Sequence, residues 1–177
     1  MPTMPSASVR LRAALGVVAI AAVAGGNLLG QERLSSRAVA VVAGPADYDL
    51  SGTGWSWSAG ARLDLPVAGP LLVEPGLGVF HYDDQFSDRS WYLLPEVSVQ
   101  LQYPGRGVRP YVGVGGGWAW AVQGPGNSDL SVHAALGVRI DPKPSWGLRT
   151  EARMRNISGF EGNNSILEFV VGYSRGL

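Results

Sequence analysis

The stretch from Trp146 to Asn156, WGLRTEARMRN, constrains the fold of this chain more than any other. Every second residue in it is uncharged, whereas the residues between them include Arg149, Glu151, Arg153 and Arg155. Successive side chains of a β-strand point to opposite faces, so the alternation predicts a strand with one charged and one uncharged face. Such a charged face can be buried only where opposite charges meet it.

A second stretch, Val108 to Val122, alternates bulky apolar residues with glycine and alanine. In a water-soluble domain the bulky face would form the core, and the glycine face would meet water, where glycine is a poor strand former. In a small membrane barrel the bulky face meets lipid, its tryptophans lie at the interface, and the small face makes room in a narrow lumen.

From Arg37 onward the sequence divides into eight alternating segments separated by turn-forming residues. Short connections at Pro66–Pro70, Pro104–Arg109 and Asp141–Ser145 alternate with longer polar loops, as periplasmic turns and external loops do in outer-membrane barrels. The sequence therefore predicts an all-β fold, an eight-stranded antiparallel up-and-down transmembrane β-barrel. The expected strands are Arg37–Gly44, Trp55–Val67, Leu71–Tyr82, Trp91–Tyr103, Val108–Val122, Asp129–Ile140, Trp146–Asn156 and Ile166–Leu177.

Residues 1–24 are typical of a secretory signal peptide. Arg10 and Arg12 precede an apolar run, and Ala22-Val23-Ala24 fits the small-x-small rule for cleavage. The alternative is a membrane helix, but the run is shorter than the ~20 residues that a span needs. We therefore expect a cleaved signal peptide at 1–24, a short leader at 25–36 and an outer-membrane barrel at 37–177.

Composition excludes several classes of protein. Charged residues make up 16% of the chain, below the ~25% of typical soluble domains. The formal net charge is zero, so no nucleic-acid-binding surface is indicated. The absence of cysteine excludes disulfides and thiolate sites, which suits an exported protein.

The phase of the strands predicts which side chains fill the lumen. Arginine at the membrane midplane of a barrel costs roughly 2–4 kcal/mol, so the charged faces should point inward. Arg139 and Glu168 lie on strands next to Trp146–Asn156 and are expected to pair with its charges. An eight-stranded barrel is filled by side chains, so this network of bases and acids should plug it. The expected lumen charge network is Arg62, Asp64, Glu74, Glu96, Arg139, Arg149, Glu151, Arg153, Arg155 and Glu168.

The aromatic residues fall near strand ends, in two sets. Such segregation is typical of an aromatic girdle at the two membrane interfaces. The alternative is that they form the core of a soluble sandwich, but core aromatics need not gather at strand ends. The predicted girdle consists of Trp55, Trp57, Trp91, Trp118 and Trp120 beside the longer loops and Tyr103, Trp146 and Tyr173 near the short turns.

Three stretches carry a resemblance to a known family. RPYVGVGGG in the fifth segment, VEPGLGVF at Val73–Phe80 and LPEVSVQLQY at Leu94–Tyr103 resemble the outer-membrane β-barrel domain family, which includes OmpA-like and OmpX-like small barrels. The resemblance runs from about residue 37 to the end. It implies an outer-membrane barrel that contacts lipid and is inserted by the barrel-assembly machinery. Family members usually end in an aromatic residue that this machinery recognises, whereas this sequence ends in Leu177.

Catalytic signals are scarce. The sequence holds no GxSxG, HExxH or phosphate-loop motif, and we expect no catalytic residue, metal or cofactor. Ser131, His133 and Glu151 could form a nucleophilic site, which keeps open a lipid-modifying hydrolase similar to lipid A deacylase. A soluble lipocalin-like binding barrel is a second alternative. The expected function is structural, adhesive or protective of the envelope, through external loops whose ligand the sequence does not name.

Overall fold

The computed structural model describes residues 37–48, 54–83, 89–103, 105, 107–123, 128–143, 145–158 and 165–177. The predicted signal peptide and leader lie outside these residues. No helix in the described part of the chain is long and apolar enough to cross a membrane. The strands are β1 (Ala38–Asp47), β2 (Trp55–Ala68), β3 (Leu71–Asp83), β4 (Arg89–Gln102), β5 (Val108–Gln123), β6 (Asp129–Lys143), β7 (Trp146–Ile157) and β8 (Ser165–Gly176).

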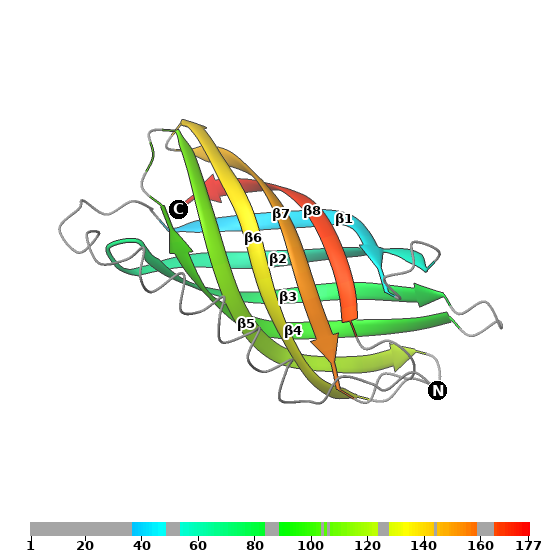
Figure 1. Cartoon of the computed structure of the whole chain (residues 1–177). Helices are drawn as coiled ribbons and strands as arrows, with labels where there is room; N and C mark the ends of the chain where they lie inside the picture. Colours follow the sequence, from blue (N-terminus) through cyan, green and yellow to red (C-terminus); the bar gives the residue numbers. More distant parts are fainter. Residues whose placement is uncertain are drawn as a thin grey trace, which may run out of the picture.

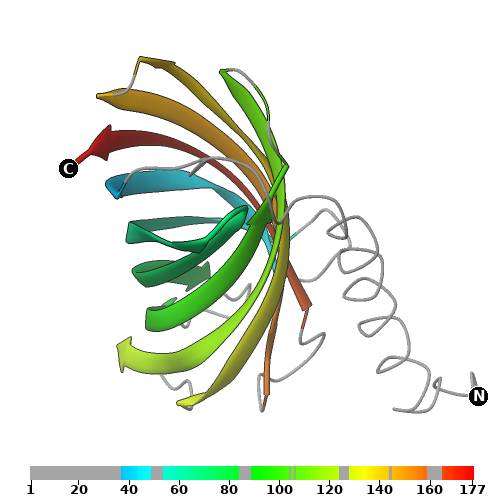
Figure 2. The ribbon, with the colours of Figure 1, turned by 90° about the vertical axis from the view of Figure 1, so that its left-hand side faces the viewer.

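Each strand pairs antiparallel with the next, and β8 returns to pair with β1, so the sheet closes into a barrel (Figures 1 and 2). The closing pair runs from Ala38 opposite Gly176 to Asp47 opposite Leu167. The predicted eight-stranded antiparallel up-and-down barrel is therefore confirmed. Its strands can be neighbours in sequence order because every connection is a simple reversal.

The two ends of the barrel differ in their connections. One end, here called the turn end, carries the connections at 69–70, 103–107 and 144–145. The backbone N–H of Leu177 donates to the carbonyl of Arg37 over 2.9 Å, so residues 37 and 177 meet at this end too. The opposite end, here called the loop end, carries the connections at 48–54, 84–88, 124–128 and 158–164.

Several strands extend past the predicted turn signals. β1 continues through Pro45 to Asp47, where a loop was expected to begin at Pro45. β6 runs to Lys143 through the expected Asp141–Ser145 turn, and its register against β7 shifts between Ile140 and Lys143. A β-bulge accommodates an extra residue without ending the strand. Proline is also tolerated at bulges, so a turn-forming residue near the end of the barrel does not show where the strand ends.

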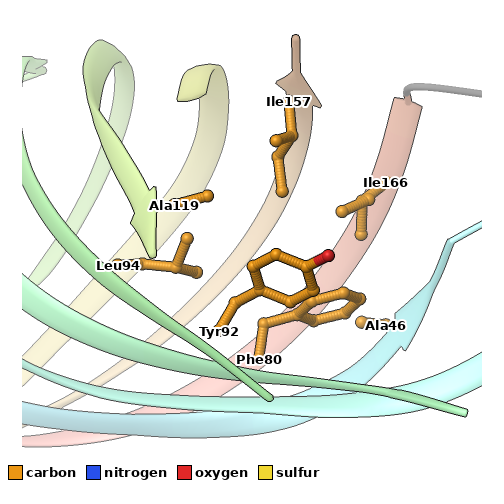
Figure 3. Packing of buried hydrophobic residues seen from close by; sticks show 7 residues of the cluster. All are labelled: Ala46, Phe80, Tyr92, Leu94, Ala119, Ile157 and Ile166. Carbon is orange, nitrogen blue, oxygen red and sulfur yellow. The ribbon is translucent and has the colours of Figure 1, made fainter. Parts of the chain in front are cut away.

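The interior is divided along the barrel axis. Near the loop end, apolar side chains from six strands pack against one another, as Figure 3 shows. Between this apolar group and the turn end, the lumen is lined by charged and polar side chains. We call the apolar group the loop-end cluster; it consists of Ala46, Phe80, Tyr92, Leu94, Ala119, Ile157 and Ile166.

Candidate functional site

The candidate site is the charged lumen. The ten charged residues predicted for it all lie inside the barrel, each at most 8% exposed. β7 contributes four of them, Arg149, Glu151, Arg153 and Arg155, on alternate positions. The strand alternation of β7 thus places four of the ten charged side chains in the lumen.

Ion pairs cross the lumen and join distant strands. Arg149 Nη1 on β7 donates to Glu74 Oε2 on β3 over 2.5 Å. Arg155 Nη1 donates to Glu96 Oε2 on β4 over 2.9 Å, and Arg153 forms an ion pair with the other oxygen of Glu96. In the sheet β7 pairs only with β6 and β8, so its contacts with β3 and β4 cross the lumen. These ion pairs join opposite walls of the barrel and fill the space between them.

Glu151 is the most highly connected carboxylate of this network. It accepts hydrogen bonds from Arg62 Nη1 at 3.0 Å, from Arg153 Nε at 2.9 Å and from Arg149 Nη2 at 3.1 Å. The hydroxyl of Tyr111 on β5 also donates to it over 2.6 Å. Because a carboxylate offers about four acceptor positions, Glu151 is fully used.

The pairs expected on strands next to β7 divide into two outcomes. Arg155 Nε donates to Glu168 Oε1 on β8 over 2.5 Å, as the adjacent strands allow. Arg139 on β6 does not pair with β7, and the expectation that it would is wrong. Its neighbour across the ladder is Arg149, a like charge, and Arg139 forms its ion pair with Asp64 on β2 instead.

Lumen glycines make room for large polar side chains. A Cβ at Gly137 would overlap the ring of Tyr111, which lies directly opposite it on β5. A Cβ at Gly115 would lie 2.6 Å from Nε2 of His133. Side chains from both neighbouring strands therefore lie over the bare face of the Val108–Val122 stretch: His133 of β6 over Gly115, and Gln100 of β4 over Gly113, where a Cβ would lie 3.2 Å from its Cγ.

The three residues of the alternative hydrolase reading are not brought together. Ser131 Oγ accepts a hydrogen bond from Arg155 Nη1 at 2.9 Å, and Glu151 is held by its arginines and Tyr111. His133 reaches across Gly115 of β5 and shares a hydrogen bond with Ser98 Oγ on β4, 2.8 Å from Nε2.

Sequence reasoning missed Ser98 as a partner of His133. Glu96 Oε2 lies 3.6 Å from His133 Nδ1, which completes a serine–histidine–glutamate row. Both oxygens of that glutamate are engaged by arginines, and Ser98 is 3% exposed. The row is a buried part of the lumen network, and only the register of three strands reveals it.

The outer wall is apolar, with aromatic residues at both ends. Among the predicted girdle residues Trp55, Trp57, Trp118, Trp120, Tyr103 and Tyr173 are exposed, and Trp91 and Trp146 are partly exposed. At the loop end the ring of His81 lies 6.1 Å from that of Trp57 and 4.9 Å from that of Trp91, and the two indoles lie 5.2 Å apart. His81 is not among the girdle residues predicted from the sequence. At the turn end the rings of Trp146 and Tyr173 stack 6.3 Å apart.

Among the described residues no group of histidine and carboxylate side chains could hold a metal ion. The predicted lumen charges are buried inside the barrel, whereas the predicted girdle residues are exposed or partly exposed. The two sets point to opposite sides of the sheet, which is the arrangement that a wall between lipid and a polar interior requires.

No protein-family model matches the chain, and no curated protein matches its sequence. Solved structures do match. The chain is similar to Neisserial surface protein A (NspA) at 15% identity and a TM-score of 0.61, over 80% of this chain and 96% of that one. It has the fold of small outer-membrane β-barrels.

Two further structures support the same fold. The outer membrane enzyme PagL matches at 14% identity and a TM-score of 0.57, over 79% of this chain and 99% of that one. The N-terminal β-barrel domain of Pseudomonas aeruginosa OprF matches at 14% identity and a TM-score of 0.52, over 79% of this chain and 97% of that one. Barrels with different functions share this fold, so the fold alone does not determine the function, which depends on the side chains that each barrel presents.

Proposed function

We propose that the protein is an integral outer-membrane β-barrel that acts without catalysis, in a structural, adhesive or envelope-integrity role. The observation that carries this proposal is the distribution of side chains across the wall. Large apolar residues cover the outside, with Leu136 63% and Val171 68% exposed, while charged residues are buried inside. A water-soluble barrel would place these two sets the other way round.

The wall would contact outer-membrane lipid, with the turn end in the periplasm and the loop end outside the cell. Short turns and both chain ends on the periplasmic side, with longer connections outside, are typical of outer-membrane barrels. The loops would then carry the adhesive or protective role. Export would use the signal peptide at 1–24, and insertion would use the barrel-assembly machinery.

The filled lumen supports a non-catalytic role over the alternatives. Ser131 and Glu151 are committed to separate arginines, which weighs against the hydrolase reading. A lipocalin-like barrel would need an apolar interior cavity, whereas the centre of this lumen holds ion pairs. A serine nucleophile needs a hydrogen bond to a base that can take its proton, whereas the partner of Ser131 is an arginine, which only donates.

Membrane fractionation tests the proposal. The protein should stay in the membrane pellet after a carbonate wash, require detergent for extraction, and migrate differently on a detergent gel before and after boiling, because a closed sheet pairs every strand. A carbonate-soluble protein with one mobility would contradict the membrane assignment. N-terminal sequencing of the pellet form should begin at or shortly after Gly25; Met1 there would contradict signal cleavage.

Two assays test the plugged, non-catalytic lumen. The purified barrel should show no large, steady conductance in planar bilayers, because side chains fill an eight-stranded lumen. It should also leave lipopolysaccharide intact in a hydrolysis assay. Hydrolysis that is lost in Ser131→Ala would favour the enzyme instead.

A further inference from the structure

The turn-end rim carries a row of three residues that faces outward. In the register of the sheet Lys143 on β6 lies opposite Trp146 on β7, and Trp146 lies opposite Arg175 on β8. Residues directly opposite in an antiparallel ladder share a face, and Trp146 shares its face with Leu148 on the outer wall. An indole is therefore flanked by two cations at the edge of the apolar wall.

Both cations are exposed, and neither forms an ion pair with any other described residue. The carboxylate nearest in sequence to Lys143, that of Asp141, is engaged by Arg109 at the mouth of the lumen. Tyr173 stacks on Trp146 from the membrane side of the row. Two unpaired cations beside stacked aromatic rings at a membrane interface suit a phosphate group held at headgroup level.

A second observation lies on the same sector of the wall. A groove of about 530 Å³ crosses the outer wall from Pro110 on β5 to Pro45 on β1. Where it crosses β7 it is lined by Thr150 and Ala152, which are small residues between larger ones on the neighbouring strands. Leu136 and Phe169 flank Ala152, and Val138 and Val171 flank Thr150; these pairs are set by the register.

The groove lies within reach of a lipid chain whose headgroup is at the rim. Thr150 follows Trp146 by four residues on β7, or ~13 Å along the strand at ~3.3 Å per residue. Because strands tilt by ~45°, this corresponds to a depth of ~9 Å. Half of the ~30 Å hydrocarbon core is ~15 Å, so an acyl chain from the leaflet at the turn end extends past this depth.

We propose that the β6–β8 sector binds one anionic glycerophospholipid of the periplasmic leaflet, with its phosphate between Lys143 and Arg175 and one acyl chain in the groove where it crosses β7. The inference rests on the proposed function, because it needs the turn end to lie at the inner surface of the outer membrane. Charge selects the headgroup, and the small residues on β7 select a sector of the wall where a chain packs closely.

Native mass spectrometry of the full barrel, released from bilayers of equal phosphatidylglycerol and phosphatidylcholine, tests the headgroup contact. The wild type should retain phosphatidylglycerol in preference, and Lys143→Gln with Arg175→Gln should lower that preference about fivefold for each cation removed, since each is worth ~1 kcal/mol near an anionic surface. Arg89→Gln, at the first residue of β4 and outside this sector of the sheet, removes a positive charge and should behave as wild type. No preference in the wild type, or an undiminished preference in the double variant, would overturn the site.

A groove variant tests the acyl chain separately. Ala152→Leu fills the groove from the lipid side and should lower the number of retained lipids of both kinds without changing their ratio. Unchanged retention would overturn the placement of the acyl chain in the groove. These failures differ from failure of the proposed function, in which the wild type would be released by carbonate and would show no heat-dependent mobility.

Discussion

Two regions of the lumen fill the same kind of space by different means. In the loop-end cluster Ile157 and its neighbours pack as an apolar core (Figure 3). Further along the same face of β7, Glu151 is held by three arginines and a tyrosine. One strand thus contributes to both, and the wall around them is continuous.

The difference teaches how each region responds to a lost group. An apolar core loses contacts in proportion to the volume removed. A buried network loses far more when one member is deleted, because its partners remain charged and cannot reach water. The charged region should therefore be sensitive to the identity of a residue and the apolar region to its size.

Glu151→Ala should have the largest effect. It leaves Arg62, Arg149 and Arg153 without a shared carboxylate, and removing one partner of a buried ion pair costs roughly 3–5 kcal/mol. The temperature at which the folded gel form disappears should fall well below that of Thr150→Ala, the matched control on the outer wall. Equal temperatures for the two variants would contradict the phase of β7.

Gly137→Ala should follow. The added methyl overlaps the ring of Tyr111 and would displace its hydroxyl from Glu151, and overpacking of this kind typically costs about 1–3 kcal/mol. The urea midpoint of the barrel in detergent measures it. In a Tyr111→Ala background the same substitution should cost less, and the remaining cost comes from the backbone oxygen of Thr150, 2.7 Å from the added Cβ. An equal cost in that background would show that the ring is not the cause.

Ile157→Val in the loop-end cluster should cost less again, about 0.5–1.5 kcal/mol, because it removes one methylene from a packed apolar site. The same urea transition reports it. A loss as large as that of Glu151→Ala would mean that the two regions do not differ in the way proposed here.

Removing a whole pair should have the smallest effect. Asp64→Leu together with Arg139→Met replaces an ion pair by apolar groups. Arg149 Nη1, which lies 3.7 Å from Asp64 Oδ1, keeps Glu74 and Glu151 as partners. Such a replacement is often neutral and should change the free energy of unfolding by less than about 1 kcal/mol. Asp64→Leu alone should be strongly destabilising. If the double variant is as unstable as Asp64→Leu alone, the loss of stability does not come from leaving Arg139 without a partner.

The fold, and the face of the sheet on which each charge lies, could be predicted from the sequence. Side chains of a strand alternate between two faces, and a charged residue shows clearly which face is polar. The choice of partners could not be read in the same way. Arg139 pairs with Asp64 rather than with β7, and His133 with Ser98, since these contacts depend on barrel register and on Gly115 having no side chain.

The loop-end cluster was missed for a related reason. Tyr92 and Leu94 share the phase of Glu96 on β4, but an apolar residue on an inward face does not break an apolar pattern. The available signal was the run of consecutive apolar residues at the start of that strand, where both faces are apolar together.

The pairing of β1 with β8 closes the barrel, and it joins the two strands that are farthest apart in the sequence. Ala38 meets Gly176, so the ladder that closes the wall joins positions separated by nearly the whole described chain. Until that ladder forms, two strands present unpaired edges, which are templates for pairing with other chains. Long-range closure is also slow, because the loop entropy is lost before the contact is gained. The newly made chain therefore passes through a state in which the sheet is open and the edges of β1 and β8 are unpaired. Correct folding depends on keeping these two edges from pairing with other chains until they pair with each other.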